Sequence, residues 1–322
     1  PCVPDGVESR IIRIGMALAR LPRVKCVKWS RLLPVLALTM LLGACSSVGL
    51  AYRQADTLAW WWLDRRLDFD DAQAPRVRQA LTQWLDWHRR HPLALAEDVA
   101  LIEEIAREAG ADTRPERLCR WWQQLRERQQ LHLQTLAGGA MADVLAGLSE
   151  AQLRHLQQAL DEDNRDWRER FVRGDADQRQ RAARERLIDR AETFYGRLDA
   201  AQRRLVAERL RASPWDAARW QLERERQQRD LIETLQALRT LQAPERERRT
   251  ALLQAWARRT LEPDDPQARQ YREQLQRFQC ELIAELHNRT DASQRREAAT
   301  RLQGWARDLR AAGAATATAA GS

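Results

Sequence analysis

Four aspartates near one another in the chain are the first residues whose types and spacing could bind a ligand. Asp64, Asp68, Asp70 and Asp71 lie within eight positions, and hard cations prefer several oxygen ligands close together. The cluster lacks the glycine and the ligand spacing of a calcium loop. Asp70 and Asp71 also stand at the start of a predicted helix, where the helix dipole favours acidic side chains. The sequence therefore predicts a helix start here rather than a metal site.

His88 and His91 form the second candidate metal site. Residues three positions apart lie on one face of a helix, so the two imidazoles could hold a transition metal ion. Neither a Glu-x-x-His pair nor a second histidine pair accompanies them. The preference of a helix carboxyl end for cationic side chains accounts for both residues without a metal.

Signatures of catalysis are missing from the sequence. It contains no glycine-rich phosphate loop, no nucleophile elbow and no cysteine with a recognisable partner histidine. We therefore predict that the protein is not an enzyme, and we assign it no catalytic residue, metal ion, cofactor or small-molecule substrate. The alternative is a metal-binding or enzymatic protein that uses the cluster Asp64–Asp71 or the pair His88 and His91.

Trp60, Arg226 and Arg229 are the residues that we expect to contact a partner. Trp60 shares a helical face with charged residues, whereas Trp62 shares one with alanine and leucine, so we expect Trp60 to be exposed and Trp62 to be core. An exposed Trp60 could rest in a membrane interface or bind a protein. Arg226 and Arg229 interrupt the apolar stripe of a long predicted helix, which suggests a charged groove. Burial of Trp60 under a neighbouring helix and intramolecular ion pairing of the arginines are the alternatives.

A short apolar run over residues 32–42 follows five basic residues and precedes Cys45. This order is typical of a signal peptide, and the run is too short for a spanning helix. The sequence Leu42-Gly43-Ala44-Cys45 resembles the lipobox of bacterial lipoproteins. The resemblance implies cleavage between Ala44 and Cys45, a lipid on Cys45, and delivery to the outer membrane, because Ser46 and not aspartate follows. We interpret residues 16–44 as the signal peptide and residues 1–15 as a possible upstream extension.

Charge and cysteine content limit the class of partner and the compartment. Seven basic and two acidic residues precede Cys45, so the net charge of +8 falls to +3 in the remainder, which argues against nucleic-acid binding. Cys119 and Cys280 are the only cysteines after Cys45. In an oxidising compartment they form either a disulfide or two separate buried thiols.

The rest of the chain predicts an all-α fold, an elongated bundle of antiparallel helices, because apolar residues recur at intervals of three and four and no alternating strand pattern is present. We expect a helical domain over residues 45–241, further helices over 242–310, and a disordered tail over 311–322. The expected helices span residues 50–66, 71–90, 93–109, 114–137, 150–173, 176–195, 200–212, 214–241, 244–261, 266–288 and 292–310.

Three helix starts share one sequence plan. Phe69–Gln73, Leu148–Gln152 and Leu198–Gln202 each give an apolar residue, an Asp or Ser N-cap, and a Gln three positions after the cap. This is the pattern of a capping box. Motifs of this kind also resemble those of the Spy/CpxP-like periplasmic chaperones.

A wider resemblance covers roughly Cys45 to Leu241. The runs Val48–Asp56, Trp61–Asp64 and Leu67–Gln73, followed by Trp84-x-x-Trp87, resemble a proteobacterial family of lipoproteins of unknown function. The resemblance implies a lipid-anchored helical protein of the cell envelope and supplies no activity.

We therefore expect a non-catalytic interaction, scaffold or chaperone-like module in the periplasm, tethered to the membrane through its lipid and bound to another envelope protein. A purely structural envelope lipoprotein is a further alternative.

Overall fold

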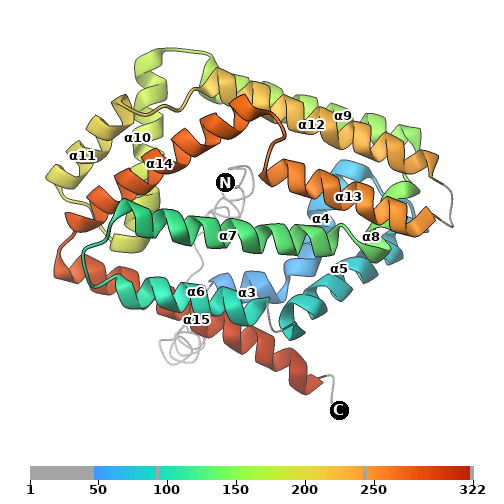
Figure 1. Ribbon diagram of the computed structural model, residues 1–322, viewed down its shortest axis with the longest axis horizontal. Coiled ribbons are helices and arrows are strands. Elements are labelled where there is room, and N and C mark those ends of the chain that lie inside the picture. Colours follow the sequence, from blue (N-terminus) through green and yellow to red (C-terminus); the bar gives the residue numbers. More distant parts are fainter. Residues whose placement is uncertain (1–46, 92–93, 242–244, 320–322) are drawn as a thin grey trace, which may run out of the picture. The chain divides into compact units, whose positions relative to one another are not determined.

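The described part of this computed structural model, residues 47–91, 94–241 and 245–319, consists of thirteen α-helices and one π-helical segment (Figure 1). It contains no strand, which confirms the all-α prediction. These residues belong to one compact unit, 46–322, which holds all of the apolar clusters of the described chain and can therefore fold without residues 1–45. No helix among them is both long and apolar enough to cross a membrane. The predicted signal peptide, Ala44 and Cys45 lie outside the described residues.

The helices follow one another along the chain with short connections. Their bounds are α3 (Ser47–Arg53), α4 (Ala55–Leu67), α5 (Gln73–Arg90), α6 (Leu95–Glu108), α7 (Pro115–Leu136), α8 (Gly139–Ala146), α9 (Glu150–Trp167), η3 (Arg168–Val172), α10 (Ala176–Tyr195), α11 (Ala200–Arg211), α12 (Ala217–Thr240), α13 (Arg246–Leu261), α14 (Pro266–Asn288) and α15 (Ala292–Ala319).

Two differences from the predicted helices lie in the amino-terminal half. The helix expected over residues 50–66 is divided at Gln54, whose backbone leaves the helical region. A short helix, α8, begins at Gly139, between the helices expected over residues 114–137 and 150–173. Gly139 has a φ of +56°, a conformation that glycine adopts without strain, and the apolar residues that follow it are buried. Tertiary burial therefore adds to the helix propensity of the alanine, methionine and leucine residues that follow Gly139.

The tail expected to be disordered over residues 311–322 is helical as far as Ala319, so that prediction is wrong for the described residues. Helix α15 lies along α6 (Figure 1). Ala312 is fully covered there, and Gly313 approaches the side chain of Leu95 so closely that a larger residue would collide with it. Alanine has the highest helix propensity, and its small side chain permits this close packing.

Trp60 is buried, which corrects the prediction that it faces a partner. It is 6% exposed, stacks on Phe69 with ring centroids 5.7 Å apart, and carries the guanidinium of Arg78 4.1 Å from its ring centroid. Trp62, expected in the core, is exposed. Three consecutive tryptophans give α4 more than one possible apolar face, and packing against α5 and α9 selects the face that carries Trp60.

The main apolar cluster joins α4, α8, α9, α12 and α13, and α9 lies beside α12 (Figure 1). Its buried leucines are Leu67, Leu148, Leu153, Leu156, Leu160, Leu235, Leu238 and Leu253. A disulfide between Cys119 and Cys280 joins α7 to α14, with the two Cα atoms 5.6 Å apart. The structure thus pairs the two cysteines for which the sequence left two alternatives.

The predicted capping boxes at Ser149 and Asp199 are confirmed, and each also forms a contact between distant helix starts. The side-chain amides of Gln73 and Gln152 bond to each other, and Gln152 also donates to the carbonyl of Asp68. Gln73 donates in turn to the carbonyl of Gly147. Each glutamine therefore caps its own helix and also donates a hydrogen bond to a backbone carbonyl in the segment that precedes the other helix.

The same arrangement recurs between α11 and α15. Gln202 and Gln294 exchange side-chain hydrogen bonds of 2.7 and 3.0 Å, and each donates to the backbone ahead of the other helix, at Arg289 and Arg197 respectively. Asp291 accepts from the backbone N–H of Gln294, so this is a further capping box that the sequence analysis missed. The hydrogen-bonding plan is therefore repeated within the chain.

Replacing Gln202 with Leu should destabilise the protein by about 2–4 kcal/mol, because several buried polar groups lose their partner at once. The measurement is the midpoint of urea unfolding. The matched control is Gln270→Leu at an exposed position, which should change stability by less than about 0.5 kcal/mol. Equal effects of the two substitutions would contradict a structural role for the buried pair.

Candidate metal centre

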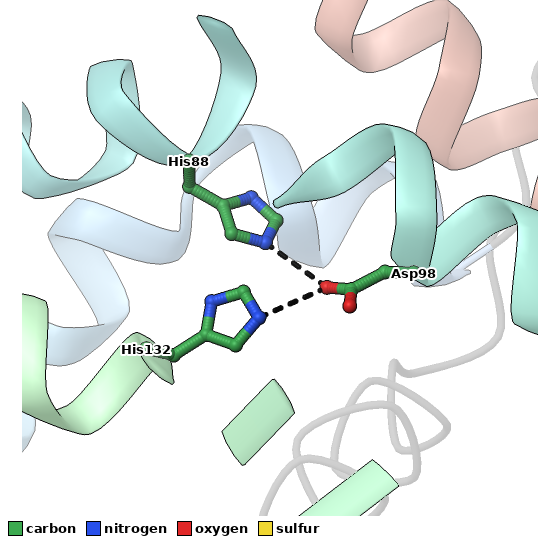
Figure 2. A group of neighbouring side chains, drawn as sticks. All are labelled: His88, Asp98 and His132. Carbon is green, nitrogen blue, oxygen red and sulfur yellow. Dashed lines mark hydrogen bonds and ion pairs between the residues drawn. The ribbon is translucent and has the colours of Figure 1, made fainter. Parts of the chain in front are cut away.

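His88, Asp98 and His132 bring two imidazoles and a carboxylate together (Figure 2). The Oδ2 atom of Asp98 lies 3.1 Å from Nε2 of His88 and 3.2 Å from Nε2 of His132. All three potential ligand atoms lie within 4.8 Å of one another. Among the described residues, this is the group of histidine, cysteine and acidic side chains whose geometry could hold a metal ion.

Three helices position these side chains. His88 lies in the last turn of α5, Asp98 in the first turn of α6, and His132 near the end of α7. A histidine at a helix carboxyl end and an aspartate at a helix amino end are both favoured by the helix dipoles. The indole N–H of Trp84 donates to the carbonyl of His132 at 3.1 Å and so ties α7 to α5.

Aromatic rings enclose the two imidazoles. The ring of His88 stacks on Trp84, and its Nδ1 lies 2.7 Å from the hydroxyl of Tyr52 on α3. Trp87 meets His132 edge-on. His88 is buried, whereas Asp98 and His132 remain partly exposed. The cluster is therefore shielded on the His88 side and accessible from the side of Asp98.

The charge of Asp98 is stabilised by its neighbours. Burial alone raises the pKa of this carboxyl, but the hydrogen bonds from His132 and His88 outweigh it and lower the pKa to about 2. Arg128 lies 3.6 Å from the second carboxylate oxygen. Asp98 is consequently an anionic ligand throughout the neutral pH range.

Two of the three ligand separations already suit a metal ion. Bonds of about 2.0–2.1 Å to three ligands of a tetrahedral ion would separate the ligand atoms by about 3.3 Å, close to the two distances from Asp98, and the two imidazole nitrogens lie within 4.8 Å of each other. Metal binding requires a lone pair on Nε2 of each imidazole. In His88 the proton would then sit on Nδ1 and be donated to the oxygen of Tyr52, which is the outer-shell contact that orients metal-bound histidines.

The sequence identified one of these three residues. His91, which the sequence offered with His88 only as an alternative metal pair, packs against Trp87 at the end of α5. Asp98 and His132 escaped notice because they follow His88 by 10 and 44 positions on other helices. The available signal was the small number of histidines, five in the whole chain, of which three, His132 among them, each stand alone on a predicted helix.

The acidic cluster does not form a metal site in the structure. Asp70 accepts hydrogen bonds from the backbone N–H groups of Ala72 and Gln73, which is the capping role that was predicted. Asp68 ends α4 in the left-handed conformation, with a φ of 48°. The backbone of Asp68 therefore ends α4, and the carboxylate of Asp70 starts α5.

Arg226 is engaged within its own helix. Its guanidinium donates two hydrogen bonds of 2.9 Å to the carboxylate of Glu223, which also binds Arg272. The alternative of intramolecular ion pairing therefore describes Arg226 better than an open charged groove. Arg229 is exposed on α12 and stays a candidate partner contact.

A second buried histidine, His287, offers no comparable ligand atom. Its Nε2 lies 2.9 Å from the carbonyl of Ala111 and its Nδ1 lies 3.0 Å from the hydroxyl of Tyr195, so the neutral ring donates to the first and accepts from the second. Burial lowers the pKa of His287 below its usual value, and the charge of Arg295 adds to this effect. This histidine is held neutral.

The unfolded chain should bind a proton at His287 below about pH 6.5, whereas the folded protein resists it, so stability falls with decreasing pH below that value. The expected slope is at most about 1.4 kcal/mol per pH unit for this group. His287→Gln can keep both hydrogen bonds without titrating. Urea unfolding between about pH 7 and about pH 5 should show a smaller slope for the variant, and an unchanged slope would contradict this assignment.

The fold and the site together define the class of protein. It is all-helical, and two of its histidines and one of its carboxylates have a geometry that could hold a metal ion. The chain belongs to a family of unknown function, DUF6279, whose model matches residues 65–258. His88, Asp98 and His132 all lie within the matched region, whereas α3 and most of α4 precede it. Neither the curated proteins nor the solved structures contain a match to this chain.

Proposed function

We propose that this protein reversibly binds a divalent transition metal ion through His88, Asp98 and His132. The observation that carries the proposal is the convergence of two imidazole nitrogens and a carboxylate oxygen within 4.8 Å. A single hydrogen-bonded His–Asp pair could be explained as a contact that joins two helices. Here a third side chain, from a third helix, brings the number of possible ligands to three, as in many protein metal sites.

The donor set selects the kind of metal. Imidazole suits Zn²⁺, Cu²⁺ and Ni²⁺, whereas Mg²⁺ and Ca²⁺ require more oxygen ligands than this cluster supplies. Three protein ligands leave a fourth position to water, unlike the closed four-ligand sites that serve only structure. The partial exposure of Asp98 and His132 provides a route for exchange. The role that this partial exposure supports is binding and release of the ion.

Equilibrium dialysis against Zn²⁺, followed by elemental analysis of the protein, tests the proposal. The chain from Ser46 to Ser322 should retain one Zn²⁺ per molecule at micromolar free metal and should not retain Mg²⁺ or Ca²⁺. The same dialysis is repeated with Cu²⁺ and with Ni²⁺. A protein that retains none of these three metal ions would overturn the proposal.

We also propose that Cys45 is lipidated and tethers the protein to the periplasmic face of the outer membrane. The lipobox-like sequence supports this tether, and the disulfide fits an oxidising compartment. Cells that express the chain should incorporate labelled palmitate into it and deliver it to the outer-membrane fraction. Retention of the label after Cys45→Ser would contradict attachment at this residue.

A second candidate function, a scaffold or chaperone-like interaction module, is favoured by the exposed side of α12. Leu222, 67% exposed, lies on the same helical face as Arg229, which is also exposed. A photoreactive residue in place of Arg229 should then crosslink one envelope protein in cells. Crosslinking that persists at the same level after Leu222→Asp would argue against this surface.

A further inference from the structure

Exposed apolar side chains are concentrated on the first two described helices. We define the anchor-proximal face as Leu50 on α3 together with Leu58, Trp61 and Trp62 on α4. Leu50 is 56% exposed and Trp61 is 69% exposed, and the other two residues are also exposed. These four account for half of the large exposed apolar residues in the described part of the chain. Such a concentration marks an interaction surface more often than isolated apolar residues do.

Helical geometry places the three α4 residues of this face on one side. Leu58, Trp61 and Trp62 have the spacing of neighbours on a helix surface. Leu50 lies on α3, before the break at Gln54, and the N–H of Gln54 bonds to the carbonyl of Leu50, so the two helices are joined directly. The opposite side of α4 carries Trp60 and Leu67, both buried in the protein core. The anchor-proximal face therefore has no described helix over it.

Charge beside this face is mixed. Arg53 and Arg65 are exposed, and so is Asp68 directly after α4, whereas Asp56 and Asp64 are partly buried. Arg66 stacks its guanidinium 4.3 Å from the ring centroid of Trp62 and donates to the carboxylate of Asp163, so it is paired within the protein. The indole of an exposed tryptophan is favoured among lipid headgroups, where an exposed arginine can bind phosphate.

The position of the face in the chain identifies its occupant. Helix α3 begins two residues after Cys45, the last residue of the lipobox-like sequence. A lipid on Cys45 would hold α3 and α4 at the membrane, where the effective concentration of bilayer is high. We propose that the anchor-proximal face binds the lipid surface itself, with the indoles of Trp61 and Trp62 inserted at the headgroup level. This inference goes beyond metal binding and does not depend on it, but its choice of occupant rests on the proposed tether at Cys45.

Vesicle sedimentation with the unlipidated chain from Ser46 to Ser322 tests the face without the tether. The probe is vesicles of phosphatidylethanolamine with a minority of phosphatidylglycerol. The wild-type chain should sediment with these vesicles, and Trp61→Ala/Trp62→Ala should weaken binding by about tenfold or more, since two indoles lose their apolar contact with lipid. The matched control, Leu125→Ala/Leu222→Ala, removes exposed apolar side chains on α7 and α12 and should bind like wild type.

Circular dichroism must show the same helix content for each variant, which is expected because the replaced side chains are exposed. Absence of vesicle binding by the wild-type chain would overturn the proposal. Equal loss in the Trp variant and in the Leu control would also overturn it, because binding would then be nonspecific. Specific crosslinking of a protein at Trp61 in cells without vesicle binding would assign the face to a protein partner instead. None of these results affects Zn²⁺ retention, so the two proposals fail separately.

Discussion

Replacing His132 with Gln should weaken Zn²⁺ binding by at least about 100-fold, equivalent to about 2.7 kcal/mol. One of three ligands is then lost, and an amide cannot replace an imidazole nitrogen as a donor to Zn²⁺. Gln can still donate a hydrogen bond to Asp98, so the metal-free fold should be nearly unchanged. The measurement is a competition titration against a chromophoric chelator.

His91→Gln is the matched control, because His91 lies in the same region at the end of α5 but takes no part in the cluster. It should bind Zn²⁺ like wild type. Asp98→Asn should lose affinity as His132→Gln does, since a neutral amide replaces the anionic ligand. A loss of affinity in His91→Gln with none in His132→Gln would assign the metal to the pair first considered from the sequence.

Removing the disulfide through Cys119→Ala/Cys280→Ala should lower the free energy of unfolding by about 3–5 kcal/mol. The bond closes a loop of 161 residues, and chain entropy assigns about 5 kcal/mol to a loop of that length. The loss should appear as a fall of about 10 °C in the thermal midpoint.

Wild-type protein treated with a strong reductant should show the same fall, and the double variant should be insensitive to the reductant. Mass spectrometry of alkylated protein gives the pairing directly. Two alkylated thiols in protein purified from the periplasm, without reduction, would contradict the disulfide.

Helix positions could be predicted from the sequence where caps and breakers agree with the apolar pattern. The helices Ala176–Tyr195 and Pro266–Asn288 match their predicted bounds. Asp175 caps the first, and Asp265 with Pro266 starts the second. The α8 helix and the carboxyl end of α15 were missed although both are rich in alanine, because each contains glycine, which lowers helix propensity, and packing on neighbouring helices offsets that cost.

The candidate site could be predicted only in part, because its residues meet through tertiary structure. His88 stood out through a local neighbour, His91, whereas the structure brings His88 together with Asp98 and His132. Burial of Trp60 illustrates the same limit, since a run of three tryptophans offers several faces and the pattern alone cannot select one. Where the local sequence allows more than one face of a helix to be buried, the neighbouring helices determine which face it is.

X-ray absorption spectroscopy of the Zn²⁺-loaded protein tests the central claim most directly, since it reports the ligands of the metal. The predicted spectrum shows nitrogen and oxygen ligands at about 2.0–2.1 Å with outer-shell scattering from two imidazoles. His132→Gln, loaded at higher Zn²⁺ concentration, should reduce the imidazole contribution to one. A spectrum of wild type with one imidazole or none would contradict binding at His88, Asp98 and His132.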